Sequence, residues 1–201
     1  MNITPYDYNR VKLLNGDNDY INASYVTGFR YEEEYIICQG PTSATSDDHW
    51  QMVFENNVAE IVQLTQFMEE MHSKCHPYWM EEVDSVVKTD KFVITTLTEQ
   101  SVEDIYSITT LNVQQLASGE SRIISIFLFK AWPDHDVPTS PVNLLAFLYA
   151  FRSVKRGNAI QPIIVHCSAG VGRSATFIAL DIQLQQLATD EKVDVLQCYH
   201  R

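Results

Sequence analysis

The sequence predicts an α/β (α+β) fold in which helices flank a twisted mixed β-sheet. Segments rich in β-branched residues alternate along the chain with segments of helical periodicity. One of the former, Ile163–Val165, carries no polar residue, which is typical of a strand at the centre of a sheet. The 201 residues are 45% hydrophobic, enough to bury one core, so we expect a single domain over residues 1–201.

The strand pattern begins near the N-terminus. Tyr20–Val26 and Tyr35–Cys38 read as two strands joined by a turn that contains Gly28. A short apolar strand is expected at Ile61–Thr65. Three β-branched segments predict further strands at Phe92–Thr96, Tyr106–Leu111 and Ile123–Phe129.

The first predicted helix follows a hydroxyl residue that can cap it, Thr45 or Ser46. Two aspartates in its first turn stabilise the helix, because their negative charges lie at the positive end of the helix dipole. Its apolar face consists of Trp50, Val53 and Phe54.

A second helix opens at Ser140-Pro141, a cap followed by proline at the first helical position. Gly157-Asn158 is expected to end it, and a third helix is predicted over Ser174–Leu187. The buried face of the second helix is expected to comprise Leu144, Leu145, Leu148, Phe151 and Val154.

Charge and composition exclude several function classes. The net charge of −12 disfavours nucleic acid and anionic membranes as partners. The longest apolar stretches, such as Ile123–Phe129, are too short to cross a bilayer, so we expect no membrane insertion in this segment. The four cysteines are scattered without framework spacing, which favours reduced thiols and a cytoplasmic location.

The segment Val165–Ser174 carries the chemistry that the sequence predicts. A tight loop that enters a helix N-terminus turns successive N–H groups toward one point and forms an anion cradle. Gly170 and Gly172 are expected to supply the backbone freedom for this turn. Cys167 at the start of the loop would be stabilised as a thiolate and act as a nucleophile. Arg173 offers two parallel donors that match two phosphate oxygens.

The spacing of Cys167 and Arg173 alone does not separate this reading from a buried free cysteine beside an arginine. The strand–loop–helix context with two glycines and a terminal hydroxyl favours the catalytic reading. The hydroxyl of Ser174 is expected to donate to the sulfur and ease its departure. The loop is not a Walker A motif, since no lysine follows the glycines.

The segment His166–Ser174 resembles the signature loop of the tyrosine-specific protein phosphatases. Other segments are similar to markers of that family and occur in its order along the chain. They are Asn18–Ser24, Gln39–Pro41, Lys74-Cys75 with Tyr78-Trp79, and Trp132–His135.

The resemblance implies a protein tyrosine phosphatase that hydrolyses phosphotyrosine in proteins through a phosphocysteine intermediate, without a cofactor. Asp134 would be the general acid of the first step and the base of the second, supported by Trp132. A Pro-Asp pair by itself is also common as a turn cap. Substrate binding would fall to Asn2, Ser168, Ala169, Gly170, Val171, Gly172 and Arg173.

One position departs from the family pattern, where glycine usually stands at Asp136. The aspartate places a second negative charge near Asp134, which would favour the protonated acid and shift the pH dependence. Glu69 is expected either to pair with Arg173 or to be a solvated glutamate in an acidic turn.

Histidines occur beside cysteines in two segments, and each segment allows a functional and a structural interpretation. His166 beside Cys167 suggests a protease-like pair, but neighbours on a strand point to opposite faces, so we expect a buried histidine that shapes the loop by hydrogen bonding. The spacing of His72, Cys75 and His76 offers no recognisable tetrahedral set, so no metal is expected.

The resemblance also implies that the domain is truncated at both ends, without the substrate-stacking tyrosine, the water-positioning loop and the last helices. Three functions therefore remain open: an active phosphatase, a phosphotyrosine-binding module that traps substrate, and a poorly folded remnant. The oligomeric state is not specified by the sequence.

Overall fold

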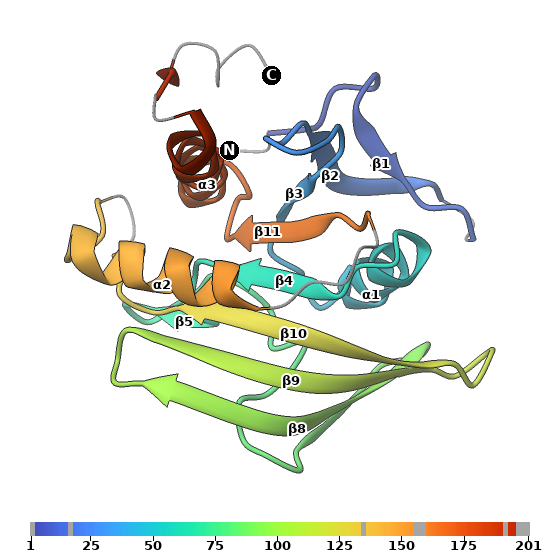
Figure 1. The fold of residues 1–201 in the computed structure, drawn as a ribbon. Helices are drawn as coiled ribbons and strands as arrows, with labels where there is room; N and C mark the ends of the chain where they lie inside the picture. Colours follow the sequence, from blue (N-terminus) through green and yellow to red (C-terminus); the bar gives the residue numbers. More distant parts are fainter. Residues whose placement is uncertain (1–2, 16–17, 134–135, 155–159, 191–192, 196–201) are drawn as a thin grey trace.

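A twisted β-sheet runs through the molecule and separates two layers of helices (Figure 1). The computed structural model describes residues 3–15, 18–133, 136–154, 160–190 and 193–195. Within these residues the large sheet has nine strands in the order β1-β2-β3-β11-β4-β10-β9-β8-β7, and β5 pairs with β6 in a small separate sheet. The predicted mixed sheet flanked by helices is confirmed.

The elements have the following bounds. The strands are β1 Arg10–Lys12, β2 Tyr20–Val26, β3 Tyr35–Gln39, β4 Glu60–Gln63, β5 Met68–Glu69, β6 His72–Ser73, β7 Val86–Lys88, β8 Phe92–Val102, β9 Tyr106–Gln115, β10 Ser121–Phe129 and β11 Ile163–Cys167. The helices are α1 Ser46–Glu55, α2 Pro141–Ser153 and α3 Gly172–Asp190.

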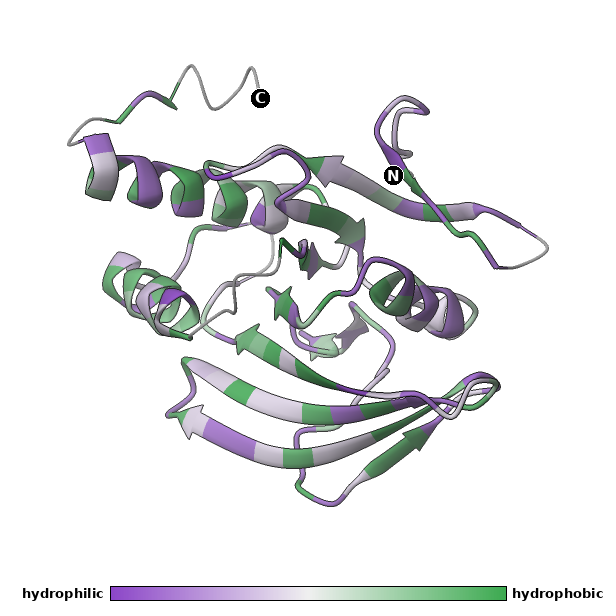
Figure 2. Cartoon of the chain, turned by 45° about the vertical axis from the view of Figure 1, so that its right-hand side comes forward, coloured by the Kyte–Doolittle hydropathy of each residue, from purple (hydrophilic) through white to green (hydrophobic). Residues whose placement is uncertain are grey.

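The centre of the large sheet is parallel and its margins are antiparallel. Strand β11 lies between β3 and β4 and is parallel to both, and β4 is parallel to β10. Antiparallel strands extend the sheet on either side, and bands of hydrophobic and hydrophilic residues alternate along β8 and β9 (Figure 2). The apolar segment Ile163–Val165 therefore occupies the predicted central position.

Alternation along β11 assigns its side chains to two separate cores. Ile164 belongs to the core under α1, together with Trp50 and Phe54. Ile163, Val165 and Cys167 belong to the core that packs against α2 and α3. The strand is buried on both faces, as the apolar segment Ile163–Val165 indicates.

A buried charge network joins α2, α3 and β3 within the second core. Arg152 Nε donates to Asp181 Oδ1 at 2.6 Å, and the Tyr35 hydroxyl donates to Asp181 Oδ2 at 2.7 Å. Arg152 also lies 3.6 Å from the fully buried Glu34. The network therefore fixes α2, which follows Trp132, to α3, which follows Cys167.

Several predicted boundaries differ from the structure. Strands β8 and β9 continue beyond the predicted Thr96 and Leu111, because pairing with each other stabilises their polar ends. Strand β4 ends at Gln63 instead of Thr65. Helix α3 begins at Gly172, two residues before the predicted start, and continues to Asp190.

The helix caps and faces also need correction. Thr45 is the N-cap of α1, but its side chain makes no cap hydrogen bond and accepts one from the Thr42 N–H instead. Ser140 is the N-cap of α2 and Pro141 its first residue, as predicted, but the Ser140 side chain makes no cap hydrogen bond. Leu145 is 40% exposed and does not belong to the buried face, because it lies on the solvent side of α2. Gly157-Asn158 lies outside the described residues.

In the described part of the chain, no helix combines the length and apolarity needed to cross a membrane. Cys38, Cys75 and Cys167 are free and buried. Cys198 lies outside the described residues.

Candidate active site

The candidate active site lies at the C-terminal end of β11, where residues 168–171 connect the strand to α3. Gly170 has a φ of 73°, and a Cβ at this position would lie 2.2 Å from the Cys38 carbonyl oxygen. Only glycine fits there without strain. The expectation for Gly172 is wrong: a Cβ there would meet open space, and its φ is not in the left-handed region, because the residue is already the first of α3.

Cys167 and His166 point to opposite faces of the sheet. The Cys167 side chain belongs to the core beneath α2 and α3 and is 5% exposed. His166 is fully buried on the other side, where its Nε2 lies 2.7 Å from the Tyr78 hydroxyl and its Nδ1 lies 3.2 Å from the Cys167 carbonyl oxygen. No cysteine–histidine pair forms, as predicted.

The partners of His166 define its protonation. A carbonyl oxygen only accepts, so Nδ1 carries the proton of the neutral ring and donates to it, and Nε2 accepts a hydrogen bond from the Tyr78 hydroxyl. Burial lowers the pKa of His166 to about 4, and the hydrogen bond to Cys167 opposes this effect without cancelling it. The neutral ring thus holds the backbone of Cys167, the predicted nucleophile, in place.

Arg173 is held by Glu69 from the small β5–β6 sheet. Its Nη1 donates to Glu69 Oε1 at 2.7 Å and its Nη2 donates to Oε2 at 2.8 Å, a parallel pair of hydrogen bonds. Nη1 also donates to the Leu64 carbonyl at 2.9 Å. Of the two readings of Glu69, the structure contains the pairing with Arg173.

The Glu69 carboxylate is itself held by neighbours. Two donors bind its Oε1: Thr65 Oγ1 at 2.8 Å and the Gln66 N–H at 3.1 Å. Burial alone would raise the pKa of Glu69, but the hydrogen bonds from Arg173 and Thr65 outweigh burial and lower it. The glutamate is therefore ionised at neutral pH and can fix a guanidinium.

Ser174 is fully buried in the first turn of α3. Its Oγ has no hydrogen-bond partner among the described residues. The expected bond to the Cys167 sulfur is therefore not formed in this structure.

The segment that leads to the predicted acid lies beside Glu69. Trp132 and Pro133 line a pocket of about 280 Å³ together with Glu69 and Lys130. The Trp132 indole N–H donates to the Asp136 carbonyl at 2.9 Å and so closes the base of this loop. Asp134 itself lies outside the described residues.

The N-terminal segment lies close to the loop that connects β11 to α3. Ile3 and Thr4 line a pocket together with Ala169–Val171. The Asn22 side-chain amide donates to the Ile3 carbonyl at 3.0 Å and to Gln39 Oε1 at 3.0 Å. Asn2, the predicted contact to the substrate backbone, lies outside the described residues.

The metal reading of His72, Cys75 and His76 gains no geometric support. Cys75 is buried, with its sulfur 3.6 Å from the Pro41 carbonyl oxygen, whereas His72 is exposed. Within the described ranges, no group of three or more histidine, cysteine or carboxylate side chains is placed to hold a metal ion.

Sequence reasoning missed the residues that support Glu69. Gln63 accepts from the Trp79 indole N–H at 2.9 Å and donates to the Thr65 carbonyl at 2.8 Å. Thr65 in turn holds Glu69. The one available signal was a glutamine inside an otherwise apolar strand, since a buried amide needs polar partners.

The fold and this site define a class of protein. A family model described as protein-tyrosine phosphatase matches residues 1–201. The chain therefore belongs to the protein-tyrosine phosphatase family.

Individual relatives are receptor-type proteins. The chain is 39% identical over 198 residues to the receptor-type tyrosine-protein phosphatase eta of Gallus gallus. It is 38% identical over 200 residues to the receptor-type tyrosine-protein phosphatase F of Rattus norvegicus. It is 40% identical over 205 residues to the receptor-type tyrosine-protein phosphatase C of Mus musculus.

These matches cover 96%, 96% and 97% of this chain, but 14%, 10% and 15% of the three relatives, respectively. The chain thus corresponds to a small part of each relative's length.

Proposed function

We propose that the chain is a cysteine-dependent protein tyrosine phosphatase that hydrolyses phosphotyrosine in proteins. The observation that carries the proposal is the arginine held by Glu69 at the loop that begins with Cys167. A guanidinium fixed on one edge by a carboxylate presents its Nε–Nη2 edge as a second fork, which suits two phosphate oxygens. The N–H groups of Ser168–Gly172 would bind the remaining phosphate oxygens.

In the first step the Cys167 thiolate attacks phosphorus, so that a P–S bond forms as the bond between phosphorus and the tyrosine oxygen breaks. Asp134 donates its proton to the leaving phenolic oxygen. Arg173 balances the charge on the transferring phosphoryl group. The products are a neutral tyrosine and a phosphocysteine.

In the second step a water molecule attacks phosphorus and the P–S bond breaks. The Asp134 carboxylate accepts a proton from that water, which restores the acid for the next cycle. Inorganic phosphate leaves, and Cys167 returns to the thiolate. A hydrogen bond from Ser174 to the departing sulfur would assist this step.

The partners proposed for this chain are phosphotyrosine-containing proteins, with a cytoplasmic location. The net charge of −12 argues against nucleic acid as a partner. It also means that the substrate phosphate is attracted by the local donors of the loop and by Arg173 and not by the global field.

A second candidate function is a phosphotyrosine trap that forms the phosphocysteine but releases it slowly. The buried Ser174 hydroxyl supports this candidate, because it makes no hydrogen bond to the sulfur that must depart. A trap differs from an enzyme only in the rate of the second step.

Time-resolved hydrolysis of an aryl phosphate and a phosphotyrosine peptide tests both candidates, with Cys167→Ser as the control. Sustained turnover that this substitution abolishes is the result expected for a phosphatase. A burst of one product per protein followed by little turnover would favour the trap. Turnover that survives Cys167→Ser would contradict both.

A further inference from the structure

Gln63 is the last residue of β4, and its side chain is fully buried near the centre of the large sheet. A glutamine side chain has an acceptor oxygen and an NH₂ group with two donor hydrogens, so burial at this place requires polar partners. None of the steps proposed above for hydrolysis uses this side chain. Its contacts lead instead to the residues that hold Arg173.

Two contacts define the orientation of the Gln63 amide. Its Oε1 accepts from the indole N–H of the fully buried Trp79 at 2.9 Å, and its Nε2 donates to the Thr65 carbonyl at 2.8 Å. An indole N–H only donates and a carbonyl only accepts, so both ends of the amide are fixed. The Tyr78 hydroxyl lies 3.2 Å from the same Oε1, but its single proton goes to His166 Nε2, which is 2.7 Å away.

The chain leaves the sheet directly after Gln63. The ladder between β4 and β11 ends where Gln63 lies opposite His166, and one further hydrogen bond follows, from the Leu64 N–H to the His166 carbonyl at 2.9 Å. The next fixed point is the Thr65 carbonyl, which the Gln63 amide holds. The backbone of Leu64 and Thr65 is therefore anchored on one side by β11 and on the other by the side chain of Gln63.

The two residues between these anchors hold the arginine. The Leu64 carbonyl accepts from Arg173 Nη1 at 2.9 Å. Thr65 Oγ1 donates to Glu69 Oε1 at 2.8 Å, and Glu69 in turn accepts two parallel hydrogen bonds from Arg173. The guanidinium therefore takes its position from a short backbone segment that the Gln63 amide fixes.

The Thr65 hydroxyl shows why the position of this backbone matters. It has one proton and two acceptors within reach, Glu69 Oε1 at 2.8 Å and the Gln66 carbonyl at 3.2 Å. The shorter distance favours Glu69. A rotation of the Thr65 backbone, which the Gln63 amide opposes, would turn the hydroxyl toward the Gln66 carbonyl and take a donor from Glu69.

We propose that Gln63 is a positioning residue for Arg173, because its amide fixes the backbone segment that binds the guanidinium and its glutamate partner. The inference rests on the proposed function, in which Arg173 binds the substrate phosphate. An apolar side chain in place of Gln63 leaves the Thr65 carbonyl and the Trp79 N–H without their buried partners, so the segment shifts toward other partners. A displacement of about 1 Å in a binding group can lower a rate about 100-fold, and we expect about tenfold for a residue that acts through an intermediate contact.

The first measurement is the exchange of the Arg173 side-chain N–H protons with solvent, followed by NMR in the full 201-residue chain. Gln63→Met nearly retains the length of the side chain but has no donor or amide oxygen, and we expect exchange about tenfold faster than in the unsubstituted chain. Exchange at the same rate in the two proteins would overturn the proposal. Should Gln63→Met not fold, Gln63→Asn, whose shorter amide cannot reach both Trp79 and Thr65, replaces it with the same expectation.

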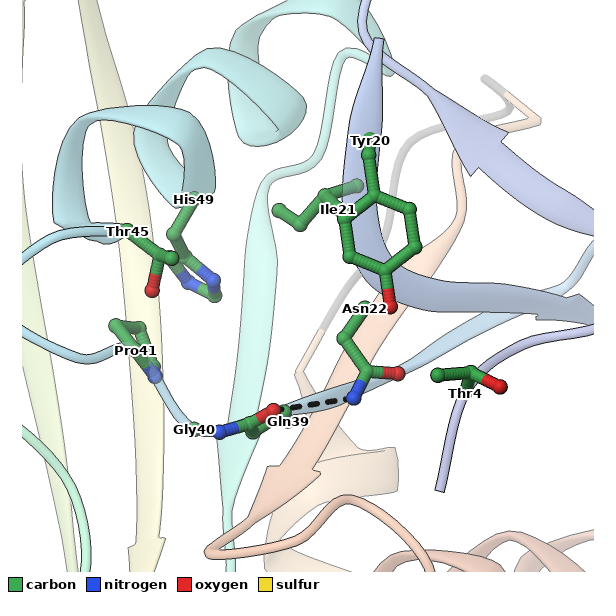
Figure 3. Close-up of a pocket in the computed structure, with 9 residues that line it drawn as sticks. All are labelled: Thr4, Tyr20, Ile21, Asn22, Gln39, Gly40, Pro41, Thr45 and His49. Carbon is green, nitrogen blue, oxygen red and sulfur yellow. Dashed lines mark hydrogen bonds between the residues drawn. The ribbon is translucent and has the colours of Figure 1, made fainter. Parts of the chain in front are cut away.

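Gln39→Met is the matched control for this measurement. Gln39 ends β3, the strand on the other side of β11, and its exposed side chain accepts from the Asn22 amide at 3.0 Å (Figure 3). The control thus also removes an amide from a strand end beside β11, but one that bonds to Asn22 and not to the segment that holds Arg173. Its exchange rate at Arg173 is expected to stay unchanged, and an acceleration equal to that of Gln63→Met would contradict the assignment.

Binding of inorganic phosphate distinguishes positioning from a general loss of stability. Gln63→Met is expected to raise Kd about tenfold in the unsubstituted chain but less than about threefold in a chain that carries Glu69→Gln, because one route from Gln63 to Arg173 is then already broken. An equal loss in both backgrounds would contradict the proposal. A chain that binds no phosphate before any substitution would count against the proposed function, whereas the exchange of the Arg173 protons would still decide the role of Gln63.

Discussion

Glu69 contacts Arg173, the proposed phosphate-binding residue, and its expected effect on substrate binding follows from how tightly it holds that side chain. Two parallel hydrogen bonds of 2.7 and 2.8 Å fix both terminal nitrogens of a guanidinium that is 9% exposed. A charged group so placed loses its orientation when its carboxylate partner is removed. We therefore propose Glu69 as a positioning residue on which the precision of phosphate binding by Arg173 depends.

Glu69→Gln keeps the size of the side chain but removes its charge and one of the two acceptors. We expect kcat/KM for a phosphotyrosine peptide to fall about 100-fold, because displacement of a binding group by about 1 Å can have an effect of that size. Binding of inorganic phosphate should weaken in parallel. Glu70→Gln, at the exposed neighbour, is the matched control, and equal behaviour of the two variants would contradict the assignment.

Asp136 places a carboxylate two residues after the proposed acid, and its carbonyl closes the loop by accepting from Trp132. We expect Asp136→Gly to change turnover and to move the basic limb of the pH–rate profile to lower pH, because Asp134 would lose a neighbouring negative charge. Steady-state kinetics across the pH range provides the measurement. An unchanged profile and unchanged turnover would show that the aspartate has no electrostatic influence on the acid.

At the scale of elements, the turn between β11 and α3 depends on Gly170. We expect Gly170→Ala to destabilise the fold by at least about 1–3 kcal/mol and to abolish hydrolysis, since the residue has a φ of 73° and a Cβ would lie 2.2 Å from the Cys38 carbonyl oxygen. Urea unfolding measures the first effect. Gly172→Ala is the matched control, because open space surrounds it in the first turn of a helix, and it should be neutral or slightly stabilising.

The sequence predicts elements well where a single local signal decides them. The apolar run of β11 and the Ser140-Pro141 start of α2 are of this kind. The predicted strands β8 and β9 end too early, because their polar residues are held by cross-strand partners that no local pattern reveals. The assignment of Leu145 to the core failed for a related reason: hydrophobicity alone does not define which side of α2 faces the sheet.

The candidate site shows the same division. Cys167, Arg173 and Ser174 could be located from one contiguous motif. The choice between a paired and a solvated Glu69 required the fold, since this residue and Arg173 are 104 positions apart and meet only through the β5–β6 sheet. The contact that holds Gln63, the hydrogen bond from the Trp79 indole 16 positions further along the chain, also could not be read from a local pattern.

At the scale of the whole molecule, two buried histidines make stability depend on pH. Burial lowers the pKa of His166 to about 4 and that of His49 well below its ordinary value. In the unfolded chain both titrate near about 6.5, so the unfolded state binds more protons between these values. Stability is therefore fully present above about pH 6.5 and is lost as the pH falls toward 4.

The expected loss from His166 alone is of the order of 3 kcal/mol, and His49 adds to it. Urea unfolding at a series of pH values between about 7 and 4 measures the total. His49→Phe, which retains an aromatic ring, should reduce the dependence on pH in this window. Stability that stays level down to about pH 5 would contradict the neutral, buried state of both rings.

The central claim is that Cys167 carries the phosphoryl group during hydrolysis. The most direct measurement is mass spectrometry of the chain quenched with acid during the first turnover of a phosphotyrosine peptide. We predict one phosphoryl group on the peptide that contains Cys167, formed as tyrosine product appears and lost as inorganic phosphate is released. Product formation with an unmodified Cys167, or with the phosphoryl group on another residue, would contradict the account.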